Sequence, residues 1–65
     1  MEAFDDLYEP GQAVRHPQRP DWGVGQVQSS IGGRVTVNFE NAGKVLINAR
    51  VVTLLILPVG RMTPP

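Results

Sequence analysis

The chain has 65 residues, of which 42% are hydrophobic, and its six basic and six acidic residues give a formal net charge of zero. This length permits one small domain, and without cysteine neither a disulfide nor a thiolate metal site can stabilise it. We therefore expect a core built by packing alone, with no cofactor and no metal. The longest apolar run, 51–57, is far shorter than the ~20 residues of a membrane helix, and no signal-like segment opens the chain, so we expect a soluble, cytoplasmic protein.

Residues 1–9 form an acidic leader, with four acids and no base, so that all six basic residues fall in the remainder of the chain. In this leader Phe4, Leu7 and Tyr8 have the spacing of one or two turns of amphipathic helix, which Pro10 ends. Two interpretations stay open. The aromatic residues of the leader cover an open end of the domain, or the leader binds a partner or masks the basic face.

Alternating apolar and polar residues predict β-strands along the next part of the chain. The segment 12–16 is a first short strand. In the segment 25–31, Val27, Ser29 and Ile31 fall on one face. The residues expected to point inward in the next two strands are Val35, Val37 and Phe39 in 34–40, and Val45, Ile47 and Ala49 in 44–49.

A turn at Asn41-Ala42-Gly43 joins the last two of these strands. A three-residue loop, with its glycine in the left-handed conformation, pairs Phe39 with Val45 and Glu40 with Lys44. Apolar residues then face each other on one side of the hairpin, and opposite charges meet beside the turn.

The Gly32-Gly33 turn is also a hairpin signal. A two-residue turn there pairs Ile31 with Arg34 and puts Val27 on the polar side of the neighbouring strand. A slip of one residue moves every side chain to the other face. We therefore predict a three-residue loop or a bulge at this turn, and a tight two-residue turn with Val27 buried would contradict this prediction.

The segment 51–57 is continuously apolar and β-branched at its start, which predicts a closing strand that is buried on both sides or nearly so. If it is not covered, it is an aggregation-prone edge or a dimer contact. Pro58 ends this strand, and 58–65 is predicted to be a frayed, disordered tail.

About five short strands in residues 10–57 must curl their sheet to bury a core. The predicted fold is thus all-β, a small SH3-like or Tudor-like barrel of about five antiparallel strands. A smaller open meander that is completed by dimerisation is the alternative.

Three motifs carry a family resemblance: Pro10-Gly11-x-x-Val14-Arg15-His16-Pro17, then Trp22-Gly23-x-Gly25-x-Val27, then Val35-Thr36-Val37-Asn38-Phe39-Glu40-Asn41-Ala42-Gly43-Lys44. Across about residues 7–54 the chain resembles a family of short uncharacterised bacterial proteins. More distantly, it resembles the small C-terminal domain of UvrD/PcrA-type DNA-repair helicases. The residues that match this helicase domain are Val14, His16, Trp22, Gly23, Gly25, Val27, Val35, Val37, Phe39, Gly43, Lys44 and Leu54.

This resemblance implies a Tudor-like barrel that contacts RNA polymerase, as do related domains of transcription-repair coupling factors and CarD-type regulators. The chain departs from the helicase pattern in two respects. Its loop between His16 and Trp22 is longer, and we expect no helicase to accompany the domain. The fold therefore transfers more readily than the partner does.

Trp22 has two interpretations, as a plug at one end of the barrel or as a half-exposed anchor for a partner. An aromatic cage for methylated lysine or arginine needs several convergent aromatic residues, which the chain does not supply. His16 is expected to hydrogen-bond the loop and fix its start. A triad of His16 with Asp21 and Ser29 or Ser30 is the kind of combination that chance produces, so we expect no catalysis.

The leading hypothesis is a non-enzymatic protein-interaction module that contacts RNA polymerase or another transcription or DNA-repair protein. Its surface is expected to be the Arg15–Trp22 loop together with an exposed strand edge. A nucleic-acid-binding barrel and a subunit that self-associates through 51–57 are the alternatives, and a monomer is favoured over a dimer. The predicted partner-binding residues are Arg15, His16, Arg19, Trp22, Arg34 and Lys44, of which the last two project outward from adjacent strands.

Overall fold

The structure is a computed structural model, and it describes residues 8–58. Five antiparallel strands form one sheet in the order β4-β3-β2-β1-β5, which confirms the predicted all-β class. A short 3-10 helix, Pro20–Trp22, follows β1. The strands are β1 (Ala13–Arg15), β2 (Gly25–Ile31), β3 (Arg34–Phe39), β4 (Gly43–Asn48) and β5 (Leu55–Ile56).

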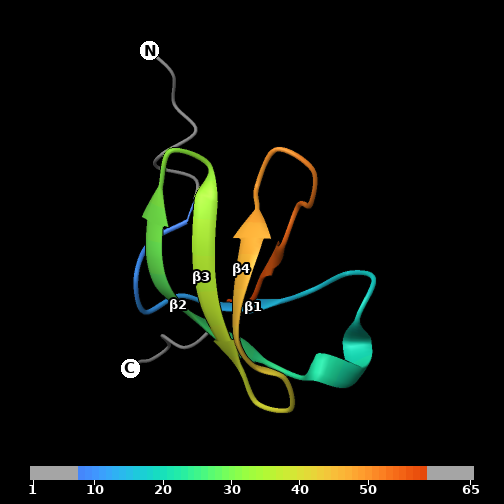
Figure 1. Ribbon diagram of the computed structural model, residues 1–65. Coiled ribbons are helices and arrows are strands. Elements are labelled where there is room, and N and C mark those ends of the chain that lie inside the picture. The colour runs from blue at the N-terminus through green and yellow to red at the C-terminus, as the bar shows by residue number, and fades with distance from the viewer. Residues whose placement is uncertain (1–7, 59–65) are drawn as a thin grey trace.

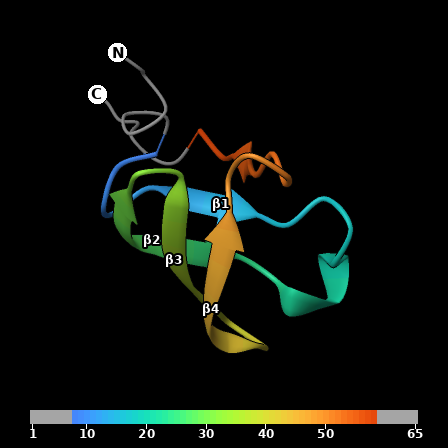
Figure 2. The ribbon, with the colours of Figure 1, turned by 45° about the horizontal axis from the view of Figure 1, so that its top comes forward.

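The sheet curls around its core. Strands β2, β3 and β4 stand side by side, and β1 crosses behind β3 and β4 in both views (Figures 1 and 2). Strand β2 joins the two parts, since it pairs with β3 along its length and with β1 at its first residues. The buried apolar residues are Tyr8, Val14, Val27, Val35, Val37, Phe39, Ile47 and Leu54.

The alternation that predicted the inward faces of β3 and β4 is confirmed. Val35, Val37, Phe39 and Ile47 are buried, and Val45 is partly buried against the same core. The predicted pairing between these strands is wrong by two residues, because Val37 pairs with Val45 and Phe39 with Gly43. A shift of two residues keeps every side chain on its predicted face.

The turn between β3 and β4 explains this shift. It consists of residues 40–42, so Glu40 lies in the turn and does not pair with Lys44. The backbone N–H of Glu40 donates to the carbonyl of Val24, which extends the β2–β3 ladder past Phe39. Gly43 has the predicted left-handed conformation, with a φ of 73°.

The turn at Gly32 and Gly33 corrects a second prediction. It is a tight two-residue turn in which Ile31 pairs with Arg34, and both glycines have positive φ, as a type I′ turn requires. The three-residue loop is therefore wrong, and so is a bulge at the turn itself. Val27 is nevertheless buried.

A bulge within β2 reconciles the tight turn with the burial of Val27. Val27 pairs with Val37 but Ser29 pairs with Thr36, so Gln28 is the extra residue. Beyond the bulge the faces are exchanged. Ile31, predicted to share the inward face of Val27, is 74% exposed.

The closing strand is shorter and more exposed than predicted. Strand β5 has two residues, Leu55 and Ile56, with exposed fractions of 52% and 50%. It pairs only with β1 among the described strands, so it is an edge of the sheet. In this segment Leu54 is buried and Val52 is partly buried against the core. The prediction of a strand buried on both sides is therefore wrong.

Tyr8 alone of the leader's apolar residues lies within the described part of the chain. It is buried, and its Oη accepts a hydrogen bond of 3.0 Å from the backbone N–H of Leu54. The expected covering of the core by the leader is thus confirmed for Tyr8. The predicted helical turns around Phe4 and Leu7, and the tail after Pro58, lie outside the described residues.

Candidate functional site

The loop between β1 and β2 carries the tryptophan. Pro20 begins its 3-10 helix, where the fixed φ of proline is favourable and no N–H is needed. The N–H of Trp22 donates to the carbonyl of Arg19, and that of Gly23 donates to the carbonyl of Pro20. The loop is therefore an ordered turn that presents Trp22 at a fixed place.

Trp22 lies between the core and the surface, and it is partly buried. The centroid of its ring is 5.1 Å from that of Phe39 and 5.0 Å from that of His16, the latter in an edge-to-face arrangement with an interplanar angle of 71°. The guanidinium carbon of Arg19 lies 4.9 Å from the indole centroid, which is cation–π geometry. Trp22 thus packs on the core and also reaches the surface, and its role as an anchor for a partner stays a prediction.

His16 has the role that the sequence predicted. It is buried, and its Nδ1 accepts a hydrogen bond of 3.1 Å from the backbone N–H of Gln18. Its carbonyl accepts a second bond from the N–H of Arg19. In neutral His16 the proton therefore resides on Nε2. These two bonds turn the chain at the start of the loop and confirm that His16 hydrogen-bonds it.

Arg19 is oriented over the tryptophan by an acidic neighbour. Its Nε and Nη2 each lie 3.4 Å from a carboxylate oxygen of Asp21. This hydrogen-bonded guanidinium holds the pKa of Asp21 below its ordinary value of 3.8. Both side chains are exposed, so the pair orders Arg19 more than it stabilises the fold.

The turn between β3 and β4 clamps the tryptophan loop from the other side. Glu40 Oε1 accepts a hydrogen bond of 3.1 Å from the N–H of Val24. The Asn41 N–H donates to the carbonyl of Trp22, and Asn41 Nδ2 donates to that of Asp21. Sequence analysis missed Glu40 and Asn41 as positioning residues, because their partners lie 16 to 20 residues away and no local pattern marks them.

Gly23 makes this clamp possible. Its φ is 78°, and a Cβ at this position would lie 2.7 Å from Glu40 Oε1. A side chain would therefore both strain the backbone and displace the carboxylate. Gly23 is thus a close-approach site between the tryptophan loop and the β3–β4 turn.

The six predicted partner-binding residues do not form one site. His16, Arg19 and Trp22 contact one another in the loop, and Arg15 is exposed at the end of β1 before it. The two remaining residues, Arg34 and Lys44, are exposed on the outer face of β3 and β4, as predicted. They lie at opposite ends of that hairpin, because Arg34 pairs with Asn48 and Lys44 with Asn38.

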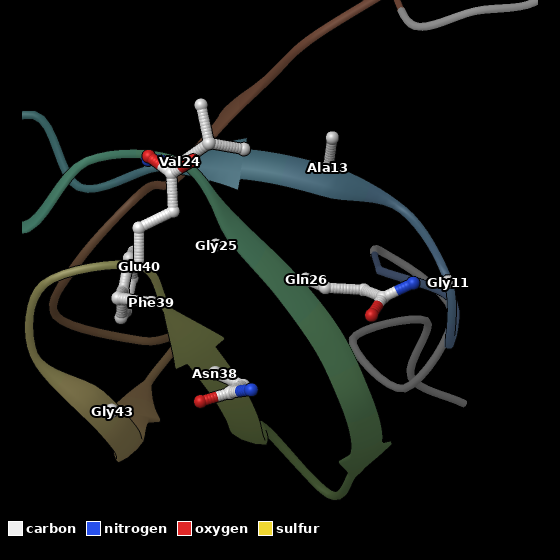
Figure 3. A pocket seen from close by; sticks show the side chains of 9 residues that line it. All are labelled: Gly11, Ala13, Val24, Gly25, Gln26, Asn38, Phe39, Glu40 and Gly43. Carbon is white, nitrogen blue, oxygen red and sulfur yellow. The ribbon is translucent and has the colours of Figure 1, made fainter.

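A shallow groove of about 510 Å³ lies beside the clamp (Figure 3). The side chains of Gln26 and Asn38 extend from adjacent strands there, and those of Val24 and Glu40 lie next to each other at one end. Its polar side chains are two amides and the carboxylate of Glu40, one oxygen of which already accepts from Val24. These groups suit hydrogen bonding to a surface rather than acid–base chemistry. The lining residues are Gly11, Ala13, Val24, Gly25, Gln26, Asn38, Phe39, Glu40 and Gly43.

The described residues provide neither a metal-binding cluster nor a membrane-spanning helix. Within 8–58, no group of three or more histidine, cysteine, aspartate or glutamate residues is placed to hold a metal ion. In the same part of the chain, no helix has the length and apolar character needed to cross a membrane.

Comparison with known proteins identifies the family. Neither the curated proteins nor the solved structures contain a match to this chain. One family matches residues 8–57, which is nearly the whole described domain, from buried Tyr8 to Leu57, the residue after β5. The chain therefore belongs to the family described as "Protein of unknown function (DUF3553)".

Proposed function

We propose that this protein is a non-enzymatic interaction module that contacts RNA polymerase or another transcription or DNA-repair protein. The contact surface is the loop from Arg15 to Trp22. The observation that carries the proposal is the fixed, half-exposed Trp22 with Arg19 over its ring. Tryptophan and arginine are the residues most enriched among those that dominate binding energy at protein interfaces.

The rigidity of the loop supports this role. The backbone on either side of Trp22 is bonded to His16 and to the β3–β4 turn, so little conformational freedom remains to be lost on binding. The partner class comes from the order of the sequence motifs, which resembles that of the Tudor-like helicase domain. The residues that carry that resemblance include Trp22 and the two rings that it contacts, His16 and Phe39.

The experiment is a pull-down from a bacterial lysate with wild type, Trp22→Ala and Arg19→Glu, with identification of the captured proteins. Wild type is expected to capture polymerase or repair subunits, and the two variants are expected to lose them. Gln28→Ala is the matched control and should capture the same proteins as wild type, because Gln28 is exposed on β2, outside this loop. If wild type captures no polymerase or repair subunit, the proposal is wrong.

Nucleic-acid binding is the alternative function. It is favoured by the exposed basic residues Arg15, Arg19, Arg34 and Lys44, of which the first two belong to the loop that carries the partly exposed Trp22 ring. Arg19 already occupies a place over that ring, which leaves less of it for a stacked base. This alternative predicts binding to DNA or RNA that weakens steeply with salt. No binding at low salt, measured by fluorescence anisotropy, would remove it.

A further inference from the structure

Strand β4 is one edge of the sheet, and no described strand pairs with its outer side (Figure 1). The Ala49 N–H donates to the Gly33 carbonyl, so Ala49 and every second residue before it, Ile47 and Val45, direct their backbone groups toward β3. The backbone groups of Lys44, Leu46 and Asn48 therefore point away from β3. The Asn48 carbonyl accepts from the N–H groups of Val51 and Val52, which closes one end of this edge. The backbone groups of Lys44 and Leu46, together with the Asn48 N–H, form an open ladder.

The side chains beside this ladder are apolar at the centre and basic around it. Leu46 is 63% exposed, with Lys44 and Asn48 on either side of it on the same face. A groove of about 600 Å³ adjoins the edge, and its charged lining residues are Arg34 and Arg50. The Arg50 side chain lies against Gly33, with its Nε 3.4 Å from the place of a Cβ there.

Charge decides which strand suits this edge. A second copy of β4 pairing around Leu46 would bring Lys44 of each copy toward Arg34 of the other, and like charges oppose such pairing. An acidic segment would instead be attracted by these basic residues. No acid is present among the described residues that line the groove, so acidic side chains of a partner would meet the positive charge of Arg34 there.

We propose that the edge of β4 binds an extended acidic segment of a partner protein, which adds to the sheet as a further strand. Alternate residues of a strand share a face. In the partner segment, an apolar residue therefore lies beside Leu46, and the residues two positions before and after it are acidic. One acidic residue lies beside Lys44. The other lies beside Asn48, within reach of Arg34. The expected motif is acidic-x-apolar-x-acidic, and its symmetry fits either strand direction. This inference rests on the proposed interaction function and adds a second surface to it.

A synthetic peptide tests the proposal. The peptide is capped at both ends and has the sequence Thr-Glu-Thr-Val-Thr-Glu-Thr. We expect saturable binding in calorimetry and, in amide NMR spectra, the largest shifts at Lys44, Leu46 and Asn48. A peptide methylated on the backbone nitrogens that face β4 should not bind, because the ladder bonds are then blocked while the protein is unchanged. A peptide with lysine in place of both glutamates should not bind either.

Two matched variants test the charge argument. Arg34→Glu should weaken binding about tenfold, whereas Arg15→Glu, the same change on β1, should weaken it much less. Trp22→Ala should bind the peptide as wild type does, so that failure of the polymerase proposal and failure of this one are distinguishable. The proposal is overturned if the glutamate peptide does not bind, if the methylated peptide binds equally well, or if the largest shifts fall outside β4.

Discussion

The Oη of Tyr8 lies 3.0 Å from the backbone nitrogen of Leu54 and accepts its hydrogen bond, joining residues 46 positions apart. Both residues are buried, so the bond closes the core where the first and last parts of the described chain meet. This one contact ties the short β5 segment to the body of the domain.

Removing the Tyr8 hydroxyl should therefore destabilise the domain more than a surface change would. Tyr8→Phe leaves the Leu54 N–H buried without a partner, which costs about 1–3 kcal/mol. The free energy of unfolding from urea titration measures this loss. A stability equal to that of wild type would show that the Leu54 N–H finds another acceptor.

Gly23 and Gly11 form a matched pair for testing the clamp on the tryptophan loop. Both have positive φ, but a Cβ would lie 2.7 Å from Glu40 Oε1 at Gly23, while nothing lies within 4 Å at Gly11. Gly11→Ala should cost about 1–2 kcal/mol from backbone strain alone. Gly23→Ala should cost more and should also change the Trp22 fluorescence. Equal losses of unfolding free energy would mean that Glu40 moves aside freely.

Ser30 offers a test with the opposite sign. Its Oγ is buried without a hydrogen-bond partner, beyond the β2 bulge. Ser30→Ala removes an unsatisfied polar group and should be neutral or stabilising, by up to about 1 kcal/mol. Chemical denaturation of both proteins measures the difference. A clear destabilisation would show that the hydroxyl is satisfied in solution.

The contact of Arg19 with Asp21 predicts a pH dependence of the loop. Because the pKa of Asp21 in the folded chain is held below its ordinary value of 3.8, the contact is fully present above pH 3.8. It is lost as the pH falls through the lowered folded value. Trp22 fluorescence should change over that range as Arg19 is released. Asp21→Asn should show the acid-form signal at neutral pH, and an unchanged signal in that variant would contradict the prediction.

Much of the fold could be predicted because apolar alternation in 34–40 and 44–49 is a local signal that burial enforces. The faces of Val35, Val37 and Ile47 followed from it. The conflict between a two-residue Gly32–Gly33 turn and the burial of Val27 could be recognised in the sequence, but the position of the bulge that resolves it, at Gln28 within β2 and not at the turn, could not be predicted. The apolar 51–57 segment misled for a different reason, because runs of apolar residues do not show how many neighbours a strand has.

The candidate site could also be predicted only in part. His16 and Trp22 could be recognised, as single residues of their type within a turn-rich segment. The residues that hold them in place could not, because Glu40 and Asn41 act through backbone groups far away in the sequence. Charge alone placed Arg34 and Lys44 in the same predicted site as the loop residues. The strand pairing shows that they lie on a separate surface, the outer face of β3 and β4.

The most direct test of the central claim is the affinity of purified bacterial RNA polymerase for wild type and for Trp22→Ala, measured by interferometry with the small protein immobilised. Circular dichroism confirms that both proteins are folded. The proposed function predicts that wild type binds and that Trp22→Ala binds at least about tenfold more weakly, as the loss of an interface anchor implies. Equal binding by the two proteins would contradict the role of Trp22 as the anchor, and no binding by wild type would contradict RNA polymerase as the partner.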